Sequence, residues 1–300
     1  MGIVSTDIPA GLTAGVRALF LKSIEGVPTH YKKLAMILPS AKSEEKYAWL
    51  SSIPGVRQFV DERQANGLRE YSFTIENKTW ESTIEVERAA LEDEQYGQIK
   101  LRIQSLAETA ARHKDQLVLE LVRDGFTNAG YDGAAFFSDD HPSPSGDLSN
   151  VAADALSATA LQTAITNMAK QTDDNGNPLG IIADTLVIPP DLEWKALELV
   201  GSNLAPESAL NAVNPLRGRL DVIVSPYLSD TTNWFVFATK SALKPFILQE
   251  RIPVEFEALD GKSGSESAFM RDRFYYGVRA RYNAGYGLWQ LAYGSAASGS

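Results

Sequence analysis

The sequence contains no cysteine and only three histidines. The absence of cysteine excludes disulfides, thiolate catalysis and cysteine-ligated metal sites. The histidines are His30, His113 and His141, and none belongs to a metal-binding pattern such as HExxH. The glycine-rich patterns that bind phosphate are absent, as is the GxSxG pattern of many hydrolases. We therefore expect no cofactor and no metal ion.

Long apolar runs are also missing, and no stretch approaches the roughly 20 residues needed to cross a bilayer. The N-terminus lacks the basic start and the apolar run of a secretory signal. Acidic residues outnumber basic ones, 38 to 28, which gives a formal net charge of −10. Long-range attraction to phosphate needs positive potential, so we expect no membrane partner and no specific recognition of nucleic acid.

Residues 1–67 contain short helical patterns that cannot bury much surface on their own. The segment 13–24 carries apolar residues at helical spacing, namely Val16, Leu19, Phe20 and Ile24. A second short helix is expected over 43–53, with Ser43 as its N-cap. Both patterns are typical of an arm rather than of an independent domain.

Residues 68–94 alternate between apolar and polar side chains on both sides of a polar turn at Asn77 and Lys78. The apolar positions are Tyr71, Phe73, Ile75, Trp80, Ile84 and Val86. Period-two alternation around a turn predicts a long β-hairpin. A two-stranded hairpin is marginal in water, so we expect it to dock on another surface and to contribute little to the subunit's own core.

A single long helix is expected over residues 96–124, with Gly125 as its C-terminal stop. Apolar residues keep the helical period along it, at Ile99, Ile103, Leu106, Ala110, Leu117 and Leu121. At this length the helix spans roughly 40 Å, the size of a structural spine.

Helices and short strands follow in a mixed order. Helices are expected over 156–170 and from Asp191 to Gly201, with Trp194 and Trp234 in the core. Strands are expected over 186–188, 220–227, 233–239, 244–249 and 252–258. This order indicates the α+β class. The small and polar residues 295–300 are expected to form a disordered tail.

Four arginines stand among aromatic residues near the end of the sequence. They are Arg271, Arg273, Arg279 and Arg281, and the residues between them include Phe274, Tyr276, Val278, Ala280 and Tyr282. On a strand the two sets fall on opposite faces. The segment does not match an RNA-binding RNP1 pattern. We expect the arginine face to meet the acidic residues Glu81, Glu85 and Glu87, either within the chain or on a neighbouring subunit.

The stretch DDHPSPSGD (139–147) offers the one candidate for catalysis. Asp139, Asp140 and His141 could bind a metal, or His141 could act as a base toward Ser143 or Ser145. Proline, serine and glycine at this density favour a surface loop with an aspartate that caps a turn. We favour the loop interpretation and expect no catalytic residues.

Three segments resemble the major head subunit family of Mu-like phages, and the order of elements resembles the Hong Kong 97-type capsid fold of tailed phages. The segments are 134–150, 173–199 and 269–294. The resemblance implies an N-terminal arm at residues 1–67 and an extended loop at residues 68–94. It also implies a peripheral domain with a spine helix, formed by residues 95–125 and 246–294, and an axial α/β domain at residues 126–245.

The function implied by this resemblance is a major capsid protein. Its copies would assemble as hexamers and pentamers into an icosahedral head around double-stranded DNA. A separate scaffold and maturation protease are implied as partners, with decoration and portal proteins. The protein would belong to the virion and assemble in the host cytoplasm. We expect a subunit interface formed by Lys78, Trp80, Glu81, Glu85, Glu87, Arg271, Arg273, Arg279 and Arg281.

Three other functions remain open at this point. The protein could be a tail-tube subunit, or a capsid-fold compartment that encloses an enzyme. It could also be a hydrolase that uses the His141 loop.

Overall fold

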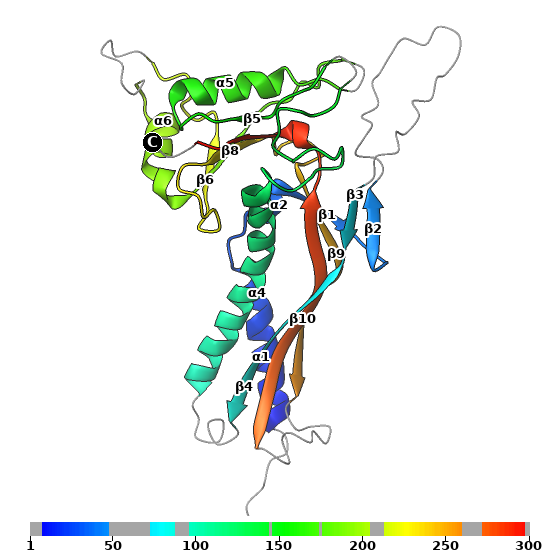
Figure 1. Ribbon diagram of the computed structural model, residues 1–300. Helices are drawn as coiled ribbons and strands as arrows, with labels where there is room; N and C mark the ends of the chain where they lie inside the picture. The colour runs from blue at the N-terminus through cyan, green and yellow to red at the C-terminus, as the bar shows by residue number, and fades with distance from the viewer. Residues whose placement is uncertain are drawn as a thin grey trace, which may run out of the picture.

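The computed structural model describes residues 8–47, 73–87, 96–143, 146–173, 176–204, 213–259 and 272–297. They form an elongated part, built on a long helix and a four-stranded sheet, and a broader part at one end of it (Figure 1). The broader part contains a five-stranded sheet. Helices and strands are mixed along the chain, so the α+β class predicted from the sequence is confirmed.

Helix α4 (Tyr96–Asp124) runs along the elongated part, and its predicted bounds are confirmed at both ends. Helix α1 (Ile8–Glu25) packs along α4. The sheet beside them has the strand order β1 (Ala35–Pro39), β9 (Phe246–Leu259), β10 (Arg273–Tyr286) and β4 (Lys78–Glu87). The shared core includes Phe20, Ile103, Val86, Phe256, Phe274 and Tyr276. Helix and sheet thus bury one apolar face each against the other.

The broader part is a mixed sheet covered by helices. Its strand order is β5 (Val151–Ala152), β11 (Ala292–Ser295), β8 (Trp234–Phe237), β6 (Thr185–Ile188) and β7 (Asp221–Val224). Helix α5 (Ala158–Ala169) packs its buried side on the sheet and begins at Ser157, whose hydroxyl accepts from the Ala160 amide. Helix α6 (Glu193–Gly201) follows β6 after a short 3-10 turn, η2 (Pro190–Leu192).

Strands β9 and β10 join the two parts. They pair antiparallel from the elongated part up to Phe246 and Tyr286, with a register shift between Arg279 and Tyr282. The first residues of β9 lie fully buried where the two sheets approach each other. Strand β10 then leads through the 3-10 helix η3 (Trp289–Leu291) into β11. Strands β9 and β10 therefore connect the two parts directly, through short segments on either side.

The hairpin predicted over residues 68–94 is wrong in its pairing, although the described residues 73–87 are extended as expected. Strand β3 (Phe73–Glu76) pairs with β2 (Glu44–Tyr47), whereas β4 pairs with β10. The reason lies at Asn77. Its amide nitrogen donates to the Ser43 carbonyl at 2.7 Å, and its side chain donates to Ser40 and to the Lys42 carbonyl. These bonds hold the chain straight where the sequence suggests a turn.

The expectation that this segment contributes little to the core is also wrong. Ile75 and Val86 are buried, and the indole N–H of Trp80 donates to the Tyr282 carbonyl at 2.8 Å. Residues Glu44–Tyr47 form a strand where a helix was expected. The rest of the segments 43–53 and 68–94 lies partly outside the described residues.

Two further expectations need correction. Trp234 is fully buried as predicted, but Trp194 is 78% exposed, because α6 buries Ala196, Leu199 and Val200 on its other side.

The tail expected over 295–300 is ordered at its start. Ser295 ends β11 and donates to the Asp154 carbonyl at 2.7 Å, and Ala297 is buried.

Three consecutive residues in the middle of α4 tie the helix to three other elements. His113 Nδ1 lies 2.8 Å from the Tyr282 hydroxyl of β10. The Lys114 ammonium donates to Glu250 of β9 at 2.6 Å. Asp115 accepts from the amides of His30 and Tyr31 at 2.7–3.0 Å, at the start of helix α2 (Tyr31–Leu34). These three polar residues therefore fix the position of α4 against the sheet.

We expect Lys114→Met to destabilise the isolated subunit by about 3–5 kcal/mol, because it leaves the carboxylate of Glu250 largely buried without its cation. Adding Glu250→Gln should recover part of the loss. Urea unfolding of the subunit measures both. The control is Arg112→Met, whose contact with Glu108 at 3.5 Å is exposed, and which should cost no more than about 0.5 kcal/mol. Equal losses for the two single variants would contradict the role of the buried pair.

A second prediction concerns Asp184, which is buried before β6. It accepts from the hydroxyls of Thr185 and Thr239 and from the amides of Thr239 and Lys240, at 2.6–3.0 Å. Burial by itself would raise the pKa of Asp184, but these hydrogen bonds outweigh it and lower the pKa below its usual range. A lowered pKa stabilises the fold above the unfolded value of about 3.9, and this stabilisation is lost as the pH falls through the folded value.

Asp184→Asn should therefore lower the free energy of unfolding at neutral pH by about 1–3 kcal/mol, the range for an unsatisfied buried group. The difference from the unchanged chain should stay constant down to about pH 5 and shrink below about pH 4. Urea unfolding across a pH series measures this difference. A gap that widens toward acid would show that Asp184 is not stabilised as the carboxylate.

Candidate subunit interface

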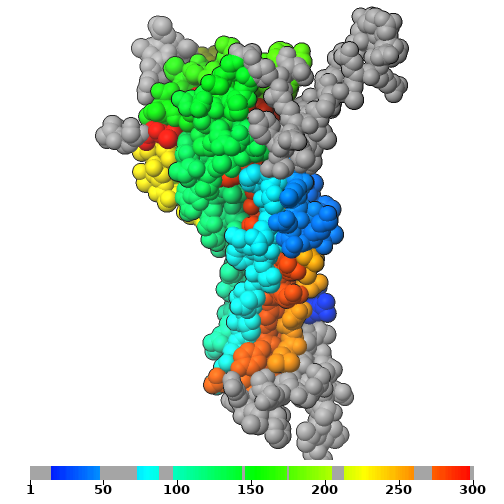
Figure 2. Space-filling model, turned by 45° about the vertical axis from the view of Figure 1, so that its right-hand side comes forward, coloured from blue at the N-terminus to red at the C-terminus, as the bar shows by residue number. Residues whose placement is uncertain are grey.

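The face of the four-stranded sheet that points away from α4 carries charged residues on three adjacent strands. Figure 2 shows β4 in cyan beside β10 and β9 in orange along this side of the molecule. We call this the charged sheet face and define it by Glu81, Glu85 and Glu87 of β4, Arg273, Arg279 and Arg281 of β10, and Glu255 and Glu257 of β9. It includes six of the nine residues expected in the interface.

The alternation predicted for β10 is confirmed. The even-numbered residues from Phe274 to Tyr282 are buried, while Arg273 and Arg281 are half-buried and Arg279 is exposed. The inward side chains pack on α4 and neighbouring strands. The strand therefore has one core face and one charged face, because successive side chains point to opposite sides of a sheet.

The acidic partner of the arginines comes from within the chain. Arg279 is in register with Glu81 of β4 on one side and with Glu255 of β9 on the other. Arg273 is in register with Glu87, and its guanidinium lies 2.5 Å from the Glu85 carboxylate. The structure thus contains one ion pair of the expected kind inside the chain, between Arg273 and Glu85, and the contact with a neighbouring subunit stays a prediction.

The charged sheet face stays accessible to solvent, and its five glutamates outnumber its three arginines. The Arg273 and Glu85 side chains are 42% and 40% exposed, so their contact is worth only about 0.2–1 kcal/mol. Arg281 stands at the register shift opposite Thr79, and its Nε is buried without a hydrogen-bond partner. Arg279 is exposed between its two carboxylates.

The remaining expected residues lie elsewhere. Lys78 is exposed at the start of β4, and Arg271 lies outside the described residues. Trp80 points to the opposite side of the sheet, where its ring lies 4.3 Å from that of His113. Both rings line a cavity of about 240 Å³ between α4 and the sheet. Burial lowers the pKa of His113, although Glu120 opposes it, and its Nδ1 shares a hydrogen bond with the Tyr282 hydroxyl.

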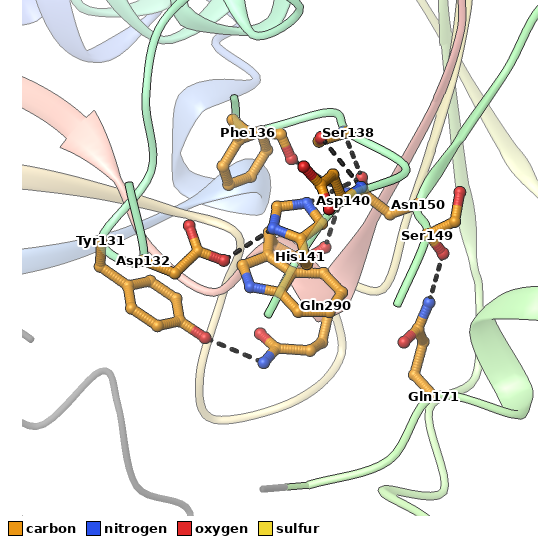
Figure 3. A network of polar contacts seen from close by, with 11 residues as sticks. Tyr131, Asp132, Phe136, Ser138, Asp140, His141, Ser149, Asn150, Gln171 and Gln290 are labelled. Atoms are coloured by element: carbon orange, nitrogen blue, oxygen red, sulfur yellow. Dashed lines mark hydrogen bonds and ion pairs between the residues drawn. The ribbon is translucent and has the colours of Figure 1, made fainter. Parts of the chain in front are cut away.

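The His141 candidate is a buried structural residue (Figure 3). Its Nδ1 lies 2.7 Å from the Asp132 carboxylate and its Nε2 lies 3.1 Å from the Asn150 side-chain oxygen. Its ring stacks on Trp289 at 3.8 Å, with an interplanar angle of 4°. The side chain has no exposed surface, so it offers no base to a substrate. The prediction of a surface loop is wrong for this residue.

Within the described part of the chain, no group of three or more histidine, aspartate or glutamate side chains could hold a metal ion. No helix among the same residues is long and apolar enough to cross a membrane.

Comparison with known proteins identifies the kind of protein that carries this surface. The family model of the Mu-like prophage major head subunit gpT matches residues 10–155, 147–228 and 229–298. The Mu-like prophage FluMu major head subunit of Haemophilus influenzae is 26% identical over 294 residues, which cover 98% of this chain and 74% of that protein. The major capsid protein of Escherichia phage Mu is 26% identical over 292 residues, with 97% and 74% covered.

Solved structures agree with these matches. The procapsid subunit of bacteriophage JBD30 is similar with a TM-score of 0.63 and 25% identity, covering 99% of this chain and 77% of that one. The virus-like particle of Pyrococcus furiosus shares the fold at 12% identity, with a TM-score of 0.55 and 94% and 98% covered. The fold is thus that of tailed-phage capsid proteins, and the chain belongs to the Mu-like prophage major head subunit family.

Proposed function

We propose that copies of this chain build the icosahedral shell of a Mu-like phage head and that the charged sheet face is one surface through which neighbouring copies meet. As a member of the major head subunit family, the protein is a structural component of the virion and not an enzyme. One observation supports the choice of surface. In the described part of the chain, the helices pack on the inner side of the four-stranded sheet, and the exposed charged side chains of Glu81, Arg279 and Glu255 stand on its outer side.

The family assignment favours the head over the tail-tube, compartment and hydrolase alternatives. We extend the proposal to hexamers and pentamers that enclose double-stranded DNA, and to a separate scaffold, protease and portal. A decoration protein is also proposed, supported by a JBD30 capsid described as decorated with minor capsid protein trimers. The net charge of −10 is consistent with DNA that is enclosed without being specifically bound.

We also propose that the part that reaches a neighbouring subunit is the β2–β3 ribbon, which takes only β3 from residues 68–94 and does not include β4. Strand β4 is part of the four-stranded sheet and so is committed to its own subunit. Strands β2 and β3 form a two-stranded sheet of their own beside it (Figure 1). Tyr47 and Ile75 of this ribbon are buried on the subunit's own core, so the exposed side of the ribbon is the one available to a second copy.

Purified protein should form shells or large oligomers, alone or with its scaffold. Light scattering and negative-stain electron microscopy would detect them. Contacts between exposed charges are screened within about 8 Å at physiological ionic strength, so assembly should depend on salt. A protein that stays monomeric at every salt and protein concentration, with the scaffold present, would refute the proposed function.

Arg279→Glu tests the charged sheet face. The change places three carboxylates side by side across β4, β10 and β9, and each like-charged pair destabilises a sheet by about 0.2–1 kcal/mol. We expect a small loss of subunit stability by thermal unfolding, and a clear loss of shells by sedimentation velocity. Adding Glu81→Lys and Glu255→Lys should restore both in part.

The matched control is Arg102→Glu, which changes the net charge equally at an exposed position of α4. It should leave subunit stability nearly unchanged. If Arg279→Glu assembles as well as this control, the charged sheet face is merely solvated and is no subunit contact.

A further inference from the structure

Helix α6 and the chain that follows it present an apolar stripe to solvent. We call it the α6 stripe and define it by Trp194, Leu197, Leu204 and Val213, which are 78%, 45%, 47% and 81% exposed. The other side of α6, including Leu199 and Val200, is buried on the five-stranded sheet. The helix is therefore apolar on two sides, and the fold of the subunit uses only one of them.

The stripe is a built feature of the fold and not a frayed end. Trp194, Leu197 and Gly201 follow one another on one side of the helix at spacings of three and four residues, and Leu204 lies in the chain just after the end of the helix. Leu204 pairs with Val213 in an antiparallel bridge. The chain that returns from Val213 is fixed to the end of α6. The Asn214 side chain donates to the Leu199 and Ser202 carbonyls, and the Gly218 amide donates to the Val200 carbonyl.

Exposed apolar surface of this kind has no role in the stability of a single subunit. A contiguous apolar patch with a polar rim is typical of a protein–protein contact. Tryptophan in particular is enriched among the residues that contribute most to binding. The exposure of Trp194 is thus explained by a contact that the isolated chain lacks.

The charges around the stripe indicate what covers it. Asp191 of η2 and Glu198 of α6 are exposed beside it, and Arg217 and Arg219 are exposed in the turn at its far end. Among the described residues, no ion pair engages any of these four side chains. A surface with unpaired acid and unpaired base around an apolar centre is complementary to another copy of itself. Nucleic acid would be repelled by the acidic edge.

We propose that the α6 stripe is a self-contact surface, covered by a second copy of this chain in the shell. This inference rests on the proposed function and adds a contact at the other end of the molecule from most of the charged sheet face. Neither surface contains residues of the other. The two surfaces can therefore be disrupted separately, which allows an experiment to tell them apart.

The test is Trp194→Ser combined with Leu197→Ser. Both side chains are exposed, so thermal unfolding of the subunit should change little. The protein concentration needed for assembly, measured by sedimentation velocity, should rise at least about tenfold, which corresponds to about 1.4 kcal/mol. The control is Leu101→Ser, which removes an apolar side chain that is 66% exposed on α4 and should leave assembly unchanged.

The four charged residues around the α6 stripe allow a second test. Arg217→Glu with Arg219→Glu should weaken assembly, and adding Asp191→Lys with Glu198→Lys should restore it in part, because the complementarity between copies is regained with reversed sign.

The outcomes separate this inference from the proposed function. If the unchanged protein and the Leu101→Ser control assemble and the stripe variant assembles equally well, the inference is overturned while the proposed function stands. The inference is also overturned if the stripe variant assembles normally but no longer binds another capsid protein, because the stripe would then contact that protein and not a second copy of this chain. If the unchanged protein never assembles with its scaffold, the proposed function itself fails.

Discussion

The pairing of β10 between β4 and β9 is the interaction on which the rest of the subunit depends. It brings residues 78–87 and 246–259 together through residues 273–286, although residues 78–87 are far from the other two segments in the sequence. The same register points apolar side chains at α4 and places Arg279 between Glu81 and Glu255. One ladder of backbone hydrogen bonds thus sets both the core of the elongated part and its charged outer surface.

Helix α4 completes this arrangement from the inner side. Its apolar residues cover the sheet, while His113, Lys114 and Asp115 each reach a different element. Buried polar groups are tolerated only when they are hydrogen-bonded, so these contacts select one position of the helix along the sheet. An elongated subunit offers long sides for contact with its neighbours, which is consistent with the family of structural head subunits to which it belongs.

Patterns that depend on local periodicity were predictable from the sequence. The ends of α4 follow from the helical period up to Gly125, and the two faces of β10 follow from alternation between residues 273 and 282. Partners that are distant in the sequence were not predictable. Asn77 looks like a turn residue because its partners, Ser40 and the carbonyls of residues 42 and 43, precede it by more than 30 positions.

The same limit applies to the candidate sites. Burial of His141 depends on stacking with Trp289, which comes from the other end of the sequence. Trp194 has the spacing of a core residue, and nothing local distinguishes a side chain that a fold buries from one that an assembly buries. The acidic partner of Arg273 could be named from charge alone, but only the strand register assigns it to the same chain.

The position of β10 and β11 in the two sheets has a consequence for synthesis on the ribosome. Strand β10 is interior to the four-stranded sheet, and β11 lies between β5 and β8 in the other. Both strands come from residues 273–295, which leave the ribosome after all the other strands. Until then β4 has no neighbour in its sheet, and neither does β5. The charged sheet face therefore cannot be complete in a nascent chain until residues 273–286 have been synthesised and have paired with β4 and β9.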